Sequence, residues 1–464
     1  MLKGAFLRAI ISVDVNELAD LVKGDWMSKE KTIHDQTETG NRQENKTPKQ
    51  LRSAAEAAAF QKEWFKNTRQ RIGDGEPFVL ANADTPHEIF LTMDIPVVMT
   101  QWWSAIISAK RLSPYYFDLM NEKGYQRDLC RYCCLPLACA MDHDPGRAPW
   151  GGLPKPTLLL ARLTCDVQTK IFERLAREYK AVFFPLEFTA PTSAYPRWWE
   201  RIKQHWDEVI EPHRLDLMVE ELKALIRYLE VTTGRTFSHA KFMEVMELVN
   251  RQEEYFTKTR DLIAQTVPSP VSLPDQIAAT MNPQWHRGTP WGVDQARMFY
   301  EEVKERVGKG EAVCKDEKVR LMWIGPGLWH NTAFYQYFEE KYGAVFVCSI
   351  YLSVAADMYA RDCLGDPLRA LASRHVTMTE FLYHRDWLAK EAKLHQVKGA
   401  VMIVSKSCIR PVGGSVGFKF TQMAFEEAGI PMLPIYADVV DAREWDDAGI
   451  RSQVSEFMEE KVLA

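Results

Sequence analysis

Short apolar runs alternate with amphipathic stretches in two separate parts of the chain. The apolar runs lie at 77–83, 96–99, 157–161 and 181–188, and again at 319–324, 344–349, 400–405 and 431–437. Short buried strands that alternate with helices are typical of parallel sheets built from βα units. The pattern therefore predicts an α/β fold with two parallel-sheet lobes of the flavodoxin or Rossmann type.

Helical periodicity dominates elsewhere in the chain. Apolar residues recur at helical spacing, which predicts helices at 53–71, 166–179, 198–229, 239–264, 293–307, 331–342, 377–393 and 418–428. The Pro-rich stretch 267–274 ends the central helical part. We expect four segments, namely a helical N-terminal region, a first α/β lobe, a helical insertion and a second α/β lobe: 1–75, 76–194, 195–317 and 318–464.

Composition and charge narrow the function classes. The 464 residues carry 58 basic and 63 acidic side chains, a formal charge of −5, which excludes the basic footprint of a general nucleic-acid binder. No apolar run reaches the length of a membrane span. Arg8 interrupts the short apolar stretch at the N-terminus, and no cleavage motif follows it. We therefore expect a cytoplasmic protein with reduced thiols and no membrane partner.

The cysteines are the strongest chemical signal. There are nine, an odd number that argues against a disulfide framework and leaves burial, metal binding or catalysis: Cys130, Cys133, Cys134, Cys139, Cys165, Cys314, Cys348, Cys363 and Cys408. Three of them follow predicted strands, where the chain turns toward a helix: Cys130, Cys165 and Cys408. Because open α/β sheets bind ligands outside the carboxyl ends of their strands, these thiols are candidates for one shared [4Fe–4S] site.

Other interpretations of the same residues stay open. The C-x2-C spacing of Cys130 and Cys133 also occurs in zinc sites and dithiols, but no second metal-binding pair follows it. Any single cysteine can also be a small buried core residue. The tryptophans pack in cores or line a pocket for an aromatic substrate: Trp102, Trp103, Trp198, Trp199, Trp285, Trp291, Trp323 and Trp329.

The glycine-rich stretch 413–417 follows the predicted strand 400–405. It does not match a dinucleotide-binding fingerprint, and the chain contains no P-loop motif. It is either a close turn or a backbone cradle for an anion, and Gly413, Gly414 and Ser415 are its candidate substrate contacts.

Several stretches together carry a family resemblance. They are TPHEIFLTMDIPVV (85–98), DLCRYCCLPLACAMD (128–142), LPKPTLLLARLTCDVQTKIFERLAREYKAVFF (153–184), YLSVAADMYARDCLGDPLRALASR (351–374) and SKSCIRPVGGSVGFKFTQMAFEEAGIPMLPIYADVVDAR (405–443). The chain resembles the benzoyl-CoA reductase / 2-hydroxyacyl-CoA dehydratase family over most of its length. It looks most like the larger cluster-binding subunit of ATP-dependent class I benzoyl-CoA reductases.

The resemblance implies a function and a set of ligands. Cys130, Cys165 and Cys408 would hold a [4Fe–4S] cluster, with Cys133 or Cys134 as a possible replacement for Cys130. The implied reaction delivers low-potential electrons to the aromatic ring of a benzoyl-CoA and gives a cyclic dienoyl-CoA, as part of anaerobic aromatic degradation. The alternatives are a 2-hydroxyacyl-CoA dehydratase subunit that acts through a ketyl radical, and an electron-transfer member without a CoA substrate.

The resemblance also implies partners. These are a smaller homologous cluster-binding subunit, a separate ATPase activator that carries a further cluster, and reduced ferredoxin as the upstream electron donor. The lack of a phosphate-binding loop in this chain agrees with ATP hydrolysis on another subunit.

Overall fold

Eight parallel strands form the two sheets around which the described residues are organised. The computed structural model describes residues 51–83, 85–127, 129–144, 146–187, 189, 193–379, 381–405, 408 and 417–464, without the side chains of 379 and 381–383. All of these residues fall in one contact unit, Lys46–Ala464. No helix in this part of the chain combines the length and apolar character that a membrane crossing requires.

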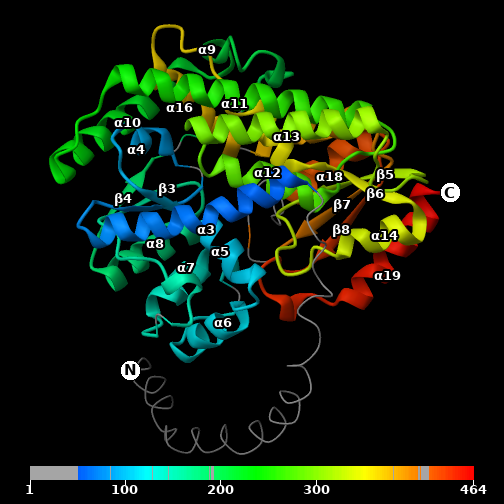
Figure 1. The fold of residues 1–464 in the computed structure, drawn as a ribbon, viewed down its shortest axis with the longest axis horizontal. Helices are drawn as coiled ribbons and strands as arrows, with labels where there is room; N and C mark the ends of the chain where they lie inside the picture. The colour runs from blue at the N-terminus through cyan, green and yellow to red at the C-terminus, as the bar shows by residue number, and fades with distance from the viewer. Residues whose placement is uncertain are drawn as a thin grey trace, which may run out of the picture. The chain divides into compact units, whose positions relative to one another are not determined.

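The two sheets have the same topology (Figure 1). The first has the order β2-β1-β3-β4, with strands β1 (Val79–Ala81), β2 (Val97–Met99), β3 (Leu158–Arg162) and β4 (Val182–Leu186). The second has the order β6-β5-β7-β8, with strands β5 (Val319–Ile324), β6 (Ala344–Ser349), β7 (Gly399–Val404) and β8 (Met432–Tyr436). All pairings are parallel, which confirms the predicted α/β fold with two parallel-sheet lobes.

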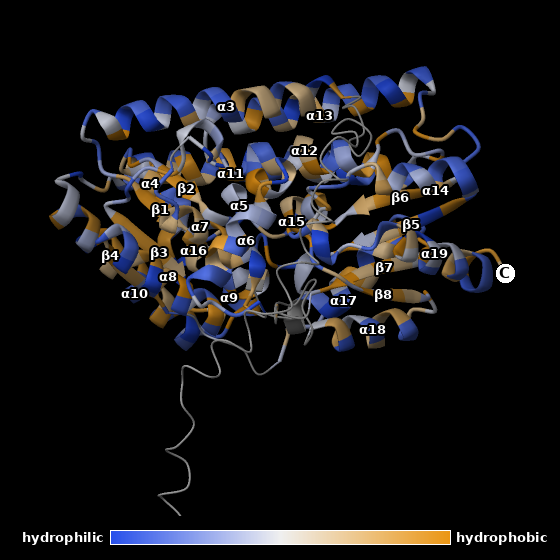
Figure 2. Cartoon of the chain, turned by 90° about the horizontal axis from the view of Figure 1, so that it is seen from below, coloured by the Kyte–Doolittle hydropathy of each residue, from blue (hydrophilic) through white to orange (hydrophobic). Residues whose placement is uncertain are grey.

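The apolar runs form strands because both faces of each sheet are covered. Every residue of β3, β5, β6 and β7 is buried, as expected for inner strands flanked by helices. The outermost strands β4 and β8 are only partly buried. Figure 2 shows the strands of both sheets as mainly hydrophobic segments beneath more polar helices.

Helices cover each sheet. Around the first sheet they are α4 (His87–Thr92), α5 (Thr100–Ala109), α6 (Ser113–Glu122), α7 (Arg131–Met141) and α8 (Asp166–Tyr179). Around the second sheet they are α14 (Phe334–Tyr342), α15 (Ile350–Asp357), α16 (Pro367–Thr379), α17 (Phe381–Leu394), α18 (Gly417–Glu427) and α19 (Asp447–Phe457). Short 3-10 and π turns complete the connections: η1 (Pro149–Gly151), η2 (Trp198–Glu200), η3 (Ala442–Glu444) and η4 (Met458–Val462).

A block of helices joins the two lobes. It consists of α3 (Arg52–Gly73), α9 (Trp206–Val209), α10 (Pro212–Thr233), α11 (His239–Gln265), α12 (Leu273–Gln284) and α13 (Pro290–Lys309). Helix α11 packs on α4 of the first lobe and on α15 of the second, and α3 packs along α12 and α13 (Figures 1 and 2). Contacts on both sides place the carboxyl ends of the two sheets near each other. The division into four segments stays a prediction.

Two predicted helices are wrong in their extent. The helix expected over 198–229 is broken, because the proline that opens α10 lacks the N–H needed to continue a helix from α9. The helix expected over 377–393 is α17 alone, and α16 precedes it from Pro367.

The sequence prediction also missed α12. Its proline at Pro274 has the character of a helix breaker, yet it lies in the first turn, where a missing N–H costs no hydrogen bond. The Ser272 side chain caps this turn by accepting from the Asp275 amide.

Candidate functional site

A cavity of about 300 Å³ lies between the carboxyl ends of the two sheets. Residues that follow seven of the eight strands line it: Ala83, Gln101, Cys165, Gly325, Pro326, Ile350, Tyr351, Ser405, Cys408, Asp438 and Val439. In each sheet the chain reverses its direction of winding between the first and third strands, β1 and β3 or β5 and β7. Such switch points are where open α/β sheets bind ligands, and here two of them face one cavity.

The three predicted cysteines all line this cavity. Cys130 is the N-cap residue of α7, and Cys165 is the N-cap residue of α8. Cys408 follows β7 in the other lobe. The amides and dipole of a helix N-terminus stabilise negative charge, so two of these thiols lie where a thiolate is favoured.

A fourth cysteine reaches the same cavity. Cys133 lies in the first turn of α7, and its thiol contacts that of Cys130, which also contacts Cys408. The contact with Cys133 and burial raise the pKa of Cys130 well above its ordinary value, against the lowering effect of Cys408. A buried thiol of this kind ionises readily only beside a positive charge, such as that of a metal centre.

The remaining cysteines lie elsewhere. Cys134 is 3% exposed and packs into the apolar core, and Cys139 accepts a hydrogen bond from Trp103 Nε1 at 3.4 Å. Cys314 lies in a different hollow, where its thiol donates to the Glu339 carbonyl at 3.7 Å. Neither Cys134, Cys139 nor Cys314 lines the cavity that Cys130 lines.

The walls of the cavity are mainly apolar and aromatic. They are formed by Tyr132, Met281, Trp285, Ile350, Tyr351, Val354, Tyr359, Met378, Ile403 and Val439. The Tyr132 hydroxyl donates to the Gln101 carbonyl at 3.3 Å, and the Tyr351 hydroxyl accepts from the Gly327 amide at 3.3 Å. Burial raises the pKa of both tyrosines, so their hydroxyls stay protonated at neutral pH.

One cationic side chain, Arg287, lies in this apolar wall and is held from behind by Glu88. Arg287 Nε donates to Glu88 Oε1 at 2.7 Å, and its guanidinium lies 4.7 Å from the centre of the Tyr359 ring. Arg374 Nη1 donates to the same oxygen at 2.7 Å. Burial by itself would raise the pKa of Glu88, but the two arginines and His87 hold it far below its ordinary value.

A second buried carboxylate lies next to the same wall. Glu253 accepts from the backbone amides of Tyr359 and Ala360 at 2.5 Å each, and burial raises its pKa to about 7. Burial also lowers the pKa of Arg361 to about 9. Together with Arg287 and Arg374, these groups surround one side of the cavity with more buried guanidinium than carboxylate.

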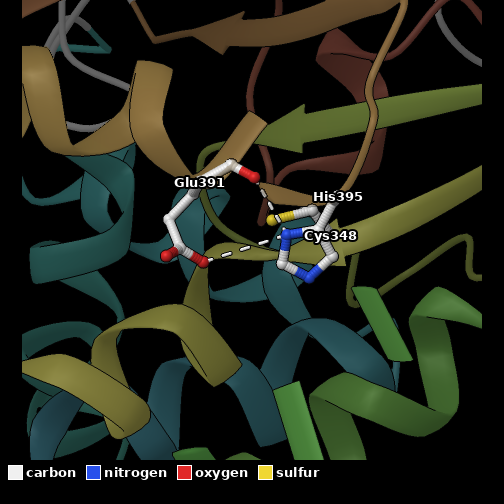
Figure 3. A group of neighbouring side chains, drawn as sticks. All are labelled: Cys348, Glu391 and His395. Atoms are coloured by element: carbon white, nitrogen blue, oxygen red, sulfur yellow. Dashed lines mark hydrogen bonds and ion pairs between the residues drawn. The ribbon is translucent and has the colours of Figure 1, made fainter. Parts of the chain in front are cut away.

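A different group of side chains has metal-ligand geometry (Figure 3). Ligand atoms of Cys348, Glu391 and His395 lie within 4.8 Å of one another, and all three residues are buried. The Glu391 carboxylate already accepts from Lys390 Nζ at 2.6 Å and from Arg260 Nη1 at 3.3 Å. These two cations face Glu391 and Asp357, so the charges already balance and a metal ion would add uncompensated positive charge. The group therefore fits a structural ion-pair network better than a metal site.

Sequence reasoning missed most of the wall. Of the eight tryptophans considered, only Trp285 lines the cavity within the described residues. Arg287 and Glu88 belong to no motif, because their pairing joins positions about 200 residues apart. Gly413, Gly414 and Ser415 lie outside the described residues.

Comparison with known proteins agrees with this geometry. Residues 82–460 match the family model described as 2-hydroxyglutaryl-CoA dehydratase, D-component. The chain belongs to this family. It is 22% identical over 406 residues to the alpha subunit of (R)-2-hydroxyisocaproyl-CoA dehydratase from Clostridioides difficile, which covers 86% of this chain and 94% of that protein.

Two further relatives differ in their named activity. The chain is 21% identical over 376 residues to the alpha subunit of (R)-phenyllactyl-CoA dehydratase from Clostridium sporogenes, covering 81% of this chain and 87% of that protein. It is 26% identical over 357 residues to a subunit of benzoyl-CoA reductase from Thauera aromatica, covering 73% and 78%. The family therefore confirms the resemblance, and it includes both dehydratase and reductase subunits.

Proposed function

We propose that this chain is the iron–sulfur subunit of an ATP-dependent benzoyl-CoA reductase. In this proposal, Cys130, Cys165 and Cys408 hold a [4Fe–4S] cluster next to the ring of a benzoyl-CoA or a substituted benzoyl-CoA. The supporting observation is that thiols from separate strand-to-helix turns of both lobes line one cavity with aromatic walls. Ring reduction takes up two electrons and two protons and leaves a cyclic dienoyl-CoA.

The donor set fits such a cluster. [4Fe–4S] clusters are held by cysteine thiolates, and the N-termini of α7 and α8 stabilise negative charge at Cys130 and Cys165. When bound, the cluster supplies single electrons at a potential that burial and hydrogen bonds to sulfur tune. Cys130 is 6% exposed, so the site has the low solvent access that a low-potential electron donor needs.

The other cavity residues bind and orient the substrate in this proposal. Tyr132, Tyr351, Trp285 and Met281 provide apolar surface for an aryl group, and a cavity of about 300 Å³ fits an acyl group better than a whole CoA thioester. Arg287 brings a fixed positive charge to the wall, where it would stabilise negative charge that develops on the thioester carbonyl.

The partners belong to the same proposal. They are a smaller homologous cluster-binding subunit, an ATPase activator with its own cluster, and reduced ferredoxin as electron donor. The relatives from Clostridioides difficile and Thauera aromatica are themselves named as subunits of their enzymes.

The alternative is that this chain belongs to a 2-hydroxyacyl-CoA dehydratase. The relatives named as dehydratase alpha subunits favour it, and they cover more of the chain than the reductase subunit does. In that reaction a ketyl radical expels the 2-hydroxyl group. An electron-transfer role without a CoA substrate is a third option, against which the apolar cavity beside the thiols argues.

Substrate assays separate these functions. The complete complex, purified without oxygen and supplied with reductant and ATP, should convert benzoyl-CoA to a cyclic dienoyl-CoA. Conversion of a 2-hydroxyacyl-CoA alone would favour the dehydratase, and no reaction with either substrate would favour the electron-transfer role.

The ligand assignment has a separate test. Cys165→Ser should lose iron and acid-labile sulfide, because a hydroxyl is a poor iron ligand. Cys314→Ser should keep both, since Cys314 lies in another hollow. Equal iron contents in the two variants would exclude Cys165 as a ligand.

A further inference from the structure

Two adjacent cysteines of α7 have different surroundings. Cys133 lines the central cavity together with Cys130, Cys165 and Cys408, so four thiols meet there. Cys134 is 3% exposed and lines a separate small hollow instead. The central cavity therefore contains one thiol more than the three that the proposed function uses.

The geometry of α7 brings Cys133 to the same point as Cys130. Cys130 is the N-cap residue, and Cys133 follows three positions later in the first turn. Side chains three positions apart lie on one face of a helix, about 5–6 Å apart at Cβ. The thiols of these two residues are in contact, and Cys130 also contacts Cys408 from the second lobe. One cluster can therefore reach thiols of both lobes and both positions of α7.

The surroundings can stabilise an additional thiolate. Cys133 lies in the first helical turn, where backbone amides that lack helical partners point outward and the helix dipole favours negative charge. The N-terminus of α8 at Cys165 adds a second such end, and Arg287 adds a full positive charge in the cavity wall. These three sources of positive potential act on the same enclosed space.

We propose that Cys133 is the fourth protein ligand of the cluster. This inference rests on the proposed cluster site, and it changes what that site can do. Three thiolates leave one iron open to water or substrate, whereas four thiolates leave none. The substrate then binds beside the four thiols, against the apolar wall, and forms no bond to iron.

Oxidation of the anaerobically purified full complex tests the fourth ligand. One equivalent of ferricyanide removes the iron that lacks a thiolate, by the reaction [4Fe–4S]2+ → [3Fe–4S]+ + Fe2+ + e−, and ferricyanide takes up the electron. The [3Fe–4S]+ product has its own EPR signal. The wild type should resist this conversion, and Cys133→Ala should give a severalfold larger signal or lose its iron. Cys134→Ala, the matched control on the same helix, should behave as the wild type.

Cys130→Ala completes the test, because it distinguishes four ligands from an exchange of ligands. Four-thiolate binding predicts that Cys130→Ala and Cys133→Ala are both sensitive to oxidation. The proposal is overturned if either variant matches the wild type, or if the wild type itself converts readily. Iron-free wild-type protein with a Cys130–Cys133 disulfide would overturn the whole cluster site instead, while lack of benzoyl-CoA reduction by an iron-loaded complex would affect only the proposed substrate.

Discussion

Removal of the Glu88 carboxylate should be among the most destabilising single changes near the site. The Glu88 side chain is 1% exposed and accepts from Arg287 and Arg374, both at 2.7 Å. The arginine side chains are 5% and 1% exposed, so neither can exchange the carboxylate for water. Removing one partner of a buried ion pair costs about 3–5 kcal/mol, because the remaining charge stays buried without compensation. We expect Glu88→Gln to lower the free energy of unfolding by about that amount.

Glu76 is a matched control that differs in burial. It also pairs with two arginines, Arg71 at 2.6 Å and Arg235 at 3.2 Å, but its side chain is 29% exposed. Ion pairs that water can reach contribute about 0–1 kcal/mol. Glu76→Gln should therefore shift the urea midpoint of unfolding much less than Glu88→Gln, as followed by tryptophan fluorescence.

The pH dependence gives the same experiment a second readout. The folded-state pKa of Glu88 lies far below its ordinary value, so its contribution is present above the unfolded-state pKa and is lost as the pH falls toward the folded-state pKa. The difference between wild type and Glu88→Gln should therefore shrink in acid. Equal midpoint shifts for the Glu88 and Glu76 variants at neutral pH would refute this reasoning about burial.

Two further predictions concern other buried carboxylates. Burial raises the pKa of Glu253 from 4.5 to about 7, so the folded state loses stability as the pH rises between these values, and Glu253→Gln should be about 3 kcal/mol more favourable relative to wild type at pH 8 than at pH 4. A constant difference across this pH range in urea unfolding would contradict it. Glu391→Gln should lower stability by about 3 kcal/mol, because it leaves Arg260 and Lys390 buried without their partner, and should leave the iron content unchanged. Iron loss from a folded Glu391→Gln variant would instead assign the group around Glu391 to metal binding.

Local sequence patterns were sufficient to find the strands. All eight predicted runs became strands, since a run of four to eight apolar residues between helices can bury both faces only as an inner strand of a parallel sheet. The same patterns placed Cys165 and Cys408 after strands, and therefore at the carboxyl edges of sheets. Helix extents were less certain where prolines were present, because a proline is compatible with a first turn and incompatible with an interior one.

Contacts between distant segments decided the rest of the site. Spacing could not tell whether Cys133 or Cys134 faces the ligand, because that depends on how α7 is rotated against its neighbours. Nor could it pair Glu88 with Arg287, since no periodic pattern connects α4 to the turn after α12. A residue's local preference is set by its neighbours along the chain, whereas the composition of a cavity is set by how the lobes pack, and only the folded chain contains that information.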